Sequence, residues 1–257
     1  MIGFLRTVLA GLFFLVVIPP GALVLFPWTF ISGKVSLIYA TAMLITRTAV
    51  WLTGTKVEVR GLDQIDPNGT YIFMSNHVSN LDPPILITHI PRRTSVLVKK
   101  ELWRIPILGK AFTIGEFVPV DRRNRESAIE SIRRASEVMR HGINMMVYPE
   151  GTRSPDGRLL PFKKGPFHLA VETGVSIVPV TILGTAEIMP KGSSIAKGGT
   201  ATVIFHPPID PKSFKSREEL MQAVAEIIES PLPPEKHAKR ENHQTAKKDG
   251  VNKEKLV

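Results

Sequence analysis

A run of 27 residues without a charged side chain, from Thr7 to Gly33, most constrains how this chain can fold. The run is rich in Leu, Val and Phe, and as one helix it would be about 40 Å long, enough to cross a bilayer with some tilt. Pro19-Pro20-Gly21 lies in its middle and is expected to bend or break such a helix. Each half would then be too short to span alone, which favours a kinked span or a re-entrant hairpin.

A second apolar run covers residues 35–52 and is interrupted by Arg47. The arginine can snorkel to the head-group level, and Trp28 and Trp51 suit a membrane interface, so this run is predicted to be an interfacial helix rather than a clean span. A cleaved signal peptide is the alternative for the first run. Because a second apolar run follows at once and no clear Ala-x-Ala site separates the two, residues 1–55 are predicted to anchor the chain to a membrane.

From residue 56 the pattern changes to alternating strands and helices. Short apolar or alternating runs predict strands, whereas amphipathic stretches bounded by capping residues and glycines predict helices. Strands are predicted at 56–60, 71–74, 94–98, 116–120, 143–148, 176–183 and 200–205, and helices at 85–90, 107–112, 124–141, 166–173 and 216–230. This alternation predicts an α/β domain over residues 56–230, whose sheet is covered by helices on both faces.

The basic residues of the chain are unevenly distributed. The formal net charge is +10, residues 92–125 hold nine Lys and Arg against three acidic residues, and residues 231–257 hold seven against four. The local excess favours an anionic ligand or an anionic membrane surface. Nucleic acid is not expected as a partner, because the excess lacks interleaved aromatic residues and no nucleic-acid-binding module is recognised. Residues 231–257 are predicted to form a basic, disordered tail.

One strand exit carries the best candidate for chemistry. The predicted strand at 71–74 leads into a block from Ser75 to Pro84 that contains His77 and Asp82. Asp82 can face the imidazole across a tight turn, fix its tautomer and leave the other ring nitrogen free to take a proton. This is the base half of a Ser-His-Asp device, and a substrate hydroxyl could be the nucleophile, because no Gly-x-Ser-x-Gly motif accompanies it. The alternative is a histidine that caps a turn, with Asp82 as a helix N-cap.

Three further blocks follow in order, namely Phe-Val-Pro-Val-Asp-Arg at 117–122, Tyr-Pro-Glu-Gly-Thr-Arg-Ser at 148–154 and Ile-Val-Pro-Val at 177–180. Together with the His77–Asp82 block they resemble the glycerolipid acyltransferases, specifically the 1-acylglycerol-3-phosphate acyltransferases, over about residues 56–210. The resemblance implies a mixed central sheet covered by helices. Two departures are mild: Tyr148 replaces the usual Phe, and Pro119 interrupts an apolar run.

The resemblance also implies an activity and its substrates. A fatty acyl chain would pass from acyl-CoA or acyl carrier protein to the sn-2 hydroxyl of 1-acylglycerol 3-phosphate, giving phosphatidic acid. His77 would be the catalytic base and Asp82 its orienting partner. The implied acceptor-binding residues are Lys100, Arg122, Glu150, Gly151, Thr152 and Arg153.

The chemistry of these side chains fits a phosphate-bearing acceptor. A guanidinium fork matches phosphate oxygens at two points, which suits Arg122 and Arg153. Glu150 is predicted to orient Arg153 or to bond an acceptor hydroxyl, and Gly151 to allow close backbone approach. The alternative for the arginines is ordinary pairing with Asp121, Glu150 or helix carboxylates.

Other functions stay open at this point. The acceptor could instead be glycerol 3-phosphate or another lysophospholipid, the chain could be a hydrolase, or it could be a non-catalytic membrane protein that binds a lipid or a carrier protein. No cofactor is expected, and no His, Asp or Glu grouping has convincing metal-ligand spacing. The expected location is a membrane with anionic head groups, on the cytoplasmic face of the cell inner membrane.

Overall fold

A mixed sheet organises the computed structural model, which describes residues 1–121 and 125–238. Seven strands of the described chain lie in the order β1-β7-β6-β2-β5-β3-β4. Strands β6 and β7 pair antiparallel, whereas the other neighbouring pairs are parallel. The strands are β1 (Thr55–Arg60), β2 (Ile72–Ser75), β3 (Thr94–Lys99), β4 (Val118–Val120), β5 (Asn144–Val147), β6 (Ile177–Leu183) and β7 (Gly199–Phe205). The predicted mixed α/β sheet is therefore confirmed.

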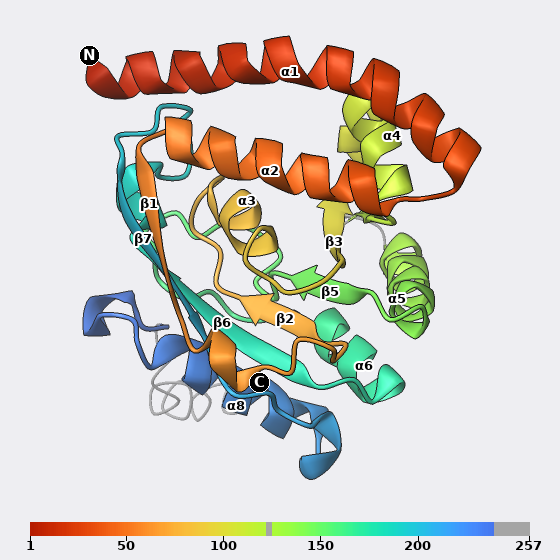
Figure 1. Cartoon of the computed structure of the whole chain (residues 1–257). Coiled ribbons are helices and arrows are strands. Elements are labelled where there is room, and N and C mark those ends of the chain that lie inside the picture. Colours follow the sequence, from red (N-terminus) through yellow and green to blue (C-terminus); the bar gives the residue numbers. More distant parts are fainter. Residues whose placement is uncertain (122–124, 239–257) are drawn as a thin grey trace, which may run out of the picture.

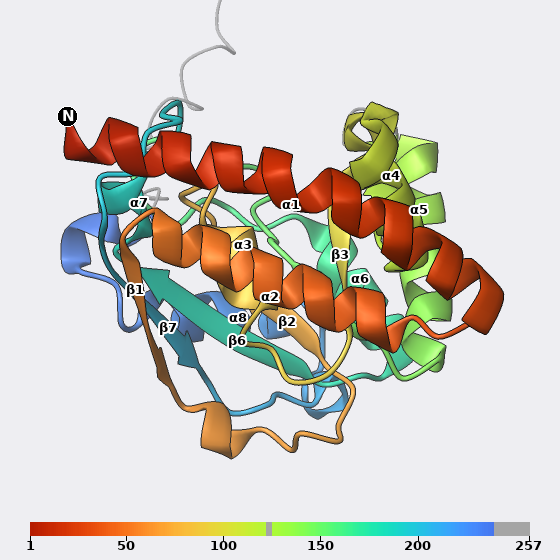
Figure 2. The ribbon, with the colours of Figure 1, turned by 45° about the horizontal axis from the view of Figure 1, so that its top comes forward.

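Helices cover both faces of this sheet (Figures 1 and 2). On one face, α2 (Ser36–Leu52) and α3 (Asp82–Ile87) pack over a core that includes Phe73, Val178 and Phe205. On the other face, α5 (Arg125–Arg140), α6 (Lys164–Thr173) and α8 (Arg217–Glu229) pack over a core that includes Phe167 and Leu220. The remaining helices are α1 (Ile2–Ser32), α4 (Pro106–Ile114) and α7 (Thr185–Ile188). The two-sided cover follows from strands that are apolar on both faces.

The local signals in the sequence located the elements well. All the strands and helices predicted between residues 56 and 230 are present, with bounds that shift by up to about three residues, as expected for frayed ends. The hydroxyl of Ser216 accepts from the amide of Glu219 at 3.1 Å, which confirms the predicted cap of α8. Glu219 accepts from the amide of Lys215 at 2.9 Å rather than from that of Ser216, so the capping box is only half formed.

The first apolar run is bent and not broken, so of the predicted bend or break only the break is wrong. Helix α1 is continuous over 31 residues and contains Pro19, Pro20 and Pro27. Proline holds φ near the helical value, so the chain stays helical, although each proline removes an amide donor and its ring crowds the carbonyl group four residues earlier. Figure 1 shows α1 as a long curved helix beside α2. By length and composition, α1 is the helix of the described chain that could cross a membrane, and only Ala10 and Thr29 of it are buried in the structure.

Two side chains join helix α2 to the domain. Arg47 is exposed, and its guanidinium donates to the carbonyl oxygen of Thr88 just after α3, with Nε at 3.1 Å. The hydroxyl of Tyr39 accepts from the amide of Thr94 at 3.1 Å. Trp51 remains exposed. Helix α2 is thus fixed to the domain, and Leu37 and Leu44 remain exposed as well.

The predicted disorder after Pro231 does not hold for residues 231–238. Leu232 is buried in the core beneath α8. The amide of Leu159 donates to the carbonyl oxygen of Lys236 at 3.0 Å, and the ammonium of Lys236 donates to that of Asp156 at 2.7 Å. Apolar burial of Leu232 anchors this stretch despite its polar composition. Residues 239–257 lie outside the described residues. The division into segments 1–55, 56–230 and 231–257 stays a prediction.

Candidate active site

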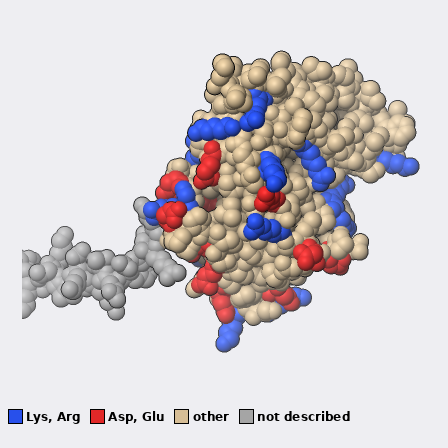
Figure 3. All heavy atoms as spheres, turned by 60° about the vertical axis from the view of Figure 1, so that its left-hand side comes forward, with Lys and Arg blue, Asp and Glu red and all other residues tan. Residues whose placement is uncertain are grey.

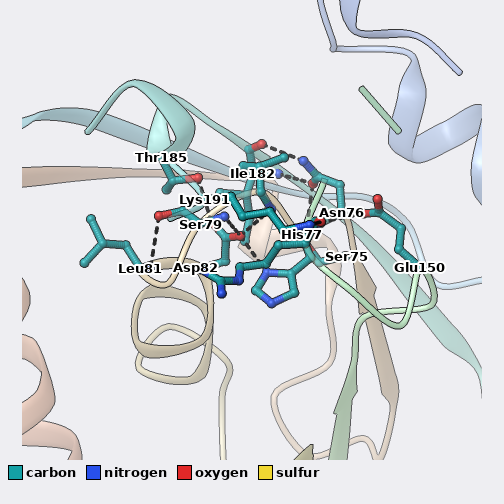
Figure 4. A network of polar contacts seen from close by, with 12 residues as sticks. Ser75, Asn76, His77, Ser79, Leu81, Asp82, Glu150, Ile182, Thr185 and Lys191 are labelled. Carbon is teal, nitrogen blue, oxygen red and sulfur yellow. Dashed lines mark hydrogen bonds and ion pairs between the residues drawn. The ribbon is translucent and has the colours of Figure 1, made fainter. Parts of the chain in front are cut away.

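The candidate site lies where three neighbouring parallel strands end. Strand β2 pairs with β6 on one side and with β5 on the other. The carboxyl ends of parallel strands meet at the same edge of a sheet, where ligands of α/β proteins commonly bind. His77 follows β2, Glu150 follows β5 and Thr185 follows β6, so the topology brings three distant segments together. Figure 4 shows these residues as one polar network.

The predicted contact between His77 and Asp82 is present. The imidazole Nδ1 lies 2.8 Å from Oδ2 of Asp82. An ionised carboxylate only accepts hydrogen bonds, so Nδ1 carries the proton and Nε2 keeps a free lone pair. The His77 side chain is 12% exposed and that of Asp82 is fully buried. The pair therefore offers one accessible basic nitrogen, Nε2, on an imidazole whose tautomer is fixed by Asp82.

Asp82 does more than orient the imidazole. Its Oδ2 also accepts from the amides of Val78 and Ser79, each at 2.7 Å, which closes the tight turn. Its Oδ1 accepts from the hydroxyl of Thr185 at 2.6 Å. Asp82 is the first residue of α3, and its side chain does not cap that helix. The N-cap alternative is therefore wrong, although the carboxylate does fix a turn.

Thr185 was missed by the sequence analysis. It is fully buried at the start of α7, two residues after β6 ends. The available signal was weak, namely a Gly-Thr pair just after a predicted strand. Its link to Asp82 depends on the pairing of β6 with β2, which no local pattern specifies.

The backbone around His77 is held from several sides. Oε1 of Glu150 accepts from the amide of His77 at 2.6 Å. The carbonyl oxygen of His77 accepts from the amide of Ser154 at 2.8 Å. The side chain of Asn76 forms two hydrogen bonds with the backbone of Ile182 on β6, at 2.9 and 2.8 Å. These bonds fix the exit of β2 between its two neighbours and limit movement of the imidazole.

Glu150 was predicted to orient Arg153 or to bond an acceptor hydroxyl, and the first of these two contacts is wrong. Glu150 is 2% exposed, and its second carboxylate oxygen accepts from the amide of Leu160 at 3.0 Å. Burial raises the pKa of Glu150 to about 8, an effect that the amides of His77 and Leu160 oppose and the charge of Asp82 reinforces. The physical reason for the error is that β5 ends beside β2, which brings the backbone amide of His77 within hydrogen-bond distance of the Glu150 carboxyl group.

Tyr148, the departure from the usual Phe, stacks on the imidazole. The two ring centroids lie 4.0 Å apart, with an angle of 20° between the planes. The tyrosine is 8% exposed, and its hydroxyl has no hydrogen-bond partner among the described residues. Burial and the charge of Asp82 hold the pKa of Tyr148 well above its ordinary value. The ring therefore packs one face of His77, and its polar end is unsatisfied.

The predicted acceptor-binding residues are placed unequally. Gly151 adopts a φ of 70°, which favours glycine, and its amide donates to the carbonyl oxygen of Tyr148 at 3.0 Å in a tight turn. Thr152 is exposed. Lys100 forms an ion pair with Asp121. Arg122 lies outside the described residues.

Arg153 is the predicted cation whose surroundings are informative. Its Nη1 is buried and has no hydrogen-bond partner within the described part of the chain. It also forms no ion pair with any described carboxylate, so the alternative of ordinary pairing does not hold for Arg153. A buried guanidinium N–H without an acceptor is costly, and an anionic ligand would satisfy it. Over the described ranges no three His, Asp or Glu residues come together as metal ligands.

Comparison with known proteins places this geometry in a family. A family model described as acyltransferase matches residues 56–183. The fold is similar to the crystal structure of the 1-acyl-sn-glycerophosphate (LPA) acyltransferase PlsC from Thermotoga maritima, with a TM-score of 0.76 and 31% sequence identity over 89% of this chain and 95% of that chain. This chain belongs to the acyltransferase family.

Curated members of the acyltransferase family match over the same region. The chain is 38% identical over 179 residues to a chloroplastic 1-acyl-sn-glycerol-3-phosphate acyltransferase of Brassica napus, covering 68% of this chain and 51% of the relative. It is 35% identical to a 1-acyl-sn-glycerol-3-phosphate acyltransferase of Limnanthes alba, covering 72% and 65%. The chain thus spans between about half and two thirds of the length of these two relatives. The resemblance to glycerolipid acyltransferases stated from the motifs is confirmed.

Proposed function

We propose that this chain transfers a fatty acyl group from a thioester carrier to the sn-2 hydroxyl of 1-acylglycerol 3-phosphate, giving phosphatidic acid. The observation that carries the proposal is the 2.8 Å bond between Nδ1 of His77 and Asp82, which leaves Nε2 as an accessible base. A Ser-His-Asp enzyme would place its own hydroxyl at Nε2, whereas here the acceptor alcohol takes that place. The names of the relatives support the choice of acceptor.

The geometry supports a direct transfer without an acyl-enzyme. Nε2 of His77 removes the proton of the sn-2 hydroxyl as its oxygen attacks the thioester carbonyl carbon, and the imidazolium is stabilised by Asp82. The tetrahedral intermediate then collapses, the carbon–sulfur bond breaks, and the proton on Nε2 passes to the departing thiolate. His77 thus ends in its starting state. The donor is acyl-CoA or acyl carrier protein, and no cofactor is required.

The acceptor's phosphate is expected to bind on the Arg153 side of His77. The unpartnered Nη1 of Arg153 supports this assignment, because a phosphomonoester dianion supplies several acceptor oxygens. Arg122 is proposed as a second phosphate ligand, and Lys100 as a nearby cation that is paired with Asp121 in the free protein. Glu150 supports the backbone of His77 in this arrangement and does not touch the acceptor.

The proposed substrates are lipids, and the exposed apolar helices suit that role. Helix α1 exposes Leu15, Leu23 and Phe30, among other apolar side chains. In Figure 3 the part of the molecule at the level of these helices carries few charged side chains, whereas Lys, Arg, Asp and Glu gather lower down. Apolar surface of this extent favours burial in a bilayer. We propose that α1 and α2 hold the site beside an anionic leaflet, on the cytoplasmic face of the cell inner membrane.

The test is acyl transfer by the purified full-length chain in detergent micelles, with 1-acylglycerol 3-phosphate as acceptor and both thioester carriers as donors. His77→Ala is expected to lower kcat by about a thousandfold. His141→Ala, which removes an exposed histidine after α5, is the matched control and is expected to keep wild-type turnover. A folded His77→Ala variant with near wild-type turnover would remove His77 as the base.

An acceptor panel separates the alternatives of the same class. Glycerol 3-phosphate, 1-acylglycerol 3-phosphate and a zwitterionic lysophospholipid are compared at equal concentration. The proposal requires that 1-acylglycerol 3-phosphate gives the highest kcat/KM. Release of free fatty acid at the full rate without any acceptor would instead identify a hydrolase.

A further inference from the structure

The loop that follows α7 lies against the turn that holds His77 and Asp82. The hydroxyl of Ser79 donates to the carbonyl oxygen of Met189 at 2.6 Å. Ser79 also forms an isolated antiparallel bridge with Pro190. Since Ser79 is one of the residues whose amide binds Asp82, this loop is joined directly to the catalytic turn. Lys191 directly follows Pro190 and therefore lies at the rim of the site.

Lys191 also contacts the segment that carries Arg153. Its ammonium donates to the carbonyl oxygen of Arg153 at 2.7 Å. The following residue, Ser154, donates its amide to the carbonyl oxygen of His77 at 2.8 Å. Lys191 and Arg153 thus come from segments far apart in the sequence and meet beside the same histidine. Figure 4 draws Lys191 in the same polar network as His77 and Asp82.

The two cations have unused donors. An ammonium has three N–H donors, and the bond to the Arg153 carbonyl uses one of them. Nη1 of Arg153 is buried without an acceptor in the described part of the chain. Neither residue forms an ion pair with a described carboxylate, although ion pairs are common elsewhere on this surface. Two cationic residues that are joined through the Arg153 carbonyl, with free donors and no ion pair to a described carboxylate, are suited to a multiply charged oxyanion.

The loop that carries Lys191 is fixed at its far end as well. The amide of Ala196 donates to the hydroxyl of Thr7 in α1 at 3.0 Å. The amide of Lys197 donates to the carbonyl oxygen of Ile188 at 2.9 Å. A loop anchored at both ends loses less conformational entropy when its lysine binds a ligand. The anchorage at Ala196 also joins the far end of this loop to the apolar helix.

We propose that Lys191 is a phosphate-binding residue that forms, with Arg153, a two-cation site for the phosphomonoester of the lipid acceptor. The inference rests on the proposed function for the identity of that acceptor. Lys191 does not act on the reacting hydroxyl. Its ammonium keeps its bond to the Arg153 carbonyl, which sets the position of the arginine, and directs its remaining donors at the phosphate oxygens.

The test measures binding rather than turnover. Isothermal titration of the full-length protein with 1-acylglycerol 3-phosphate, without any acyl donor, gives Kd for the wild type, Lys191→Met, Lys191→Arg and Lys212→Met. The methionine variant at 191 is expected to bind about tenfold more weakly, which is the loss of one charged hydrogen bond. Lys191→Arg should stay within about threefold of the wild type, since it keeps the charge. Lys212 is exposed and follows Ile209, which pairs with Ile177 at the amino end of β6, so it lies at the edge of the sheet opposite the site and serves as the matched control.

A second ligand tests the charge dependence. The methyl phosphodiester of the same acceptor carries one negative charge instead of two, so the difference between wild type and Lys191→Met should shrink to about threefold or less. Equal Kd values of wild type and Lys191→Met for the phosphomonoester would overturn the inference. If the wild-type protein binds this lipid through Lys191 but transfers no acyl group, the proposed function is overturned and the inference about Lys191 stands.

Discussion

The backbone amide of His77 donates to the buried carboxyl group of Glu150 at 2.6 Å. This bond joins the segment that follows β2 to the segment that follows β5, the neighbouring strand in the sheet. The same carboxyl group accepts from Leu160, so it ties the catalytic turn to the loop that precedes α6. Glu150 therefore supports the proposed base through the backbone, without contact with its imidazole.

Glu150 makes the stability of the fold depend on pH. The pKa of Glu150 is raised from 4.5 to about 8 in the folded chain, chiefly by burial. The folded state therefore keeps a proton that the unfolded state releases above its ordinary pKa. The stabilisation is fully present below pH 4.5 and is lost as the pH rises through about 8. Glu150→Gln does not titrate, so the free energy of unfolding of the wild type should fall relative to this variant by roughly 4 kcal/mol between pH 5 and 9.

Thermal or denaturant unfolding of both proteins across this range provides the measurement. Glu187→Gln replaces an exposed glutamate on α7 and is the matched control, for which the difference from wild type should stay flat. A difference between wild type and Glu150→Gln that does not vary with pH would show that Glu150 is ionised throughout.

Thr185 is predicted to position Asp82. Its hydroxyl donates to Oδ1 of the carboxylate at 2.6 Å, in a region from which solvent is excluded. Thr185→Val keeps the shape and removes the donor, so Asp82 is held less firmly and kcat should fall about tenfold, while KM for the acceptor stays within about twofold. Thr185→Ser should restore kcat.

The control for Thr185→Val is Thr181→Val in β6, the strand that precedes α7. Thr181 is also fully buried, but its hydroxyl donates to the carbonyl oxygen of Ile228 in α8, away from Asp82. It should lower stability and leave kcat unchanged. If Thr185→Val changes only stability, as the control does, Thr185 has no positioning role.

Tyr148→Phe is predicted to stabilise the protein. The phenol hydroxyl is buried and unpartnered within the described chain, whereas the ring stacks on His77. Removing the hydroxyl relieves an unsatisfied polar group and keeps the stack, so the free energy of unfolding should rise by about 1 kcal/mol with acyl transfer retained. Tyr148→Ala removes the ring as well and should cost about 3 kcal/mol and lower kcat. Destabilisation by Tyr148→Phe, measured by thermal unfolding, would mean that the hydroxyl has a partner in solution.

Contacts between residues that are close in the sequence were predictable, whereas contacts between distant residues were not. The His77–Asp82 contact joins residues five positions apart, and the cap of α8 joins Ser216 and Glu219, so both were predictable from local spacing. The Thr185–Asp82 bond joins residues 103 positions apart and depends on the order β6-β2-β5. Strand order is set by packing of the whole sheet and is not written in any one segment.

The errors have the same origin. Glu150 was expected beside Arg153 because the two lie in one short block, yet parallel pairing of β5 with β2 brings the amide of His77 closer. Pro19 and Pro20 were expected to bend or break α1, and the helix continues through both because the φ of proline is compatible with a helix. Local propensity was overruled in both cases by the surroundings.

The apolar face of α1 yields the last prediction. Leu15 and Leu23 are 72% and 78% exposed, and α1 carries a single charged residue, Arg6. If this face enters a bilayer, Leu15→Asp/Leu23→Asp loses the burial of two leucines and adds two carboxylates. The partition coefficient onto vesicles of anionic phospholipid should then fall at least tenfold. Ile129→Asp is the matched control, because Ile129 is an exposed apolar residue of α5, on the other face of the sheet. Co-sedimentation with vesicles measures both, and equal binding of the double variant and the wild type would show that α1 is not the membrane-binding element.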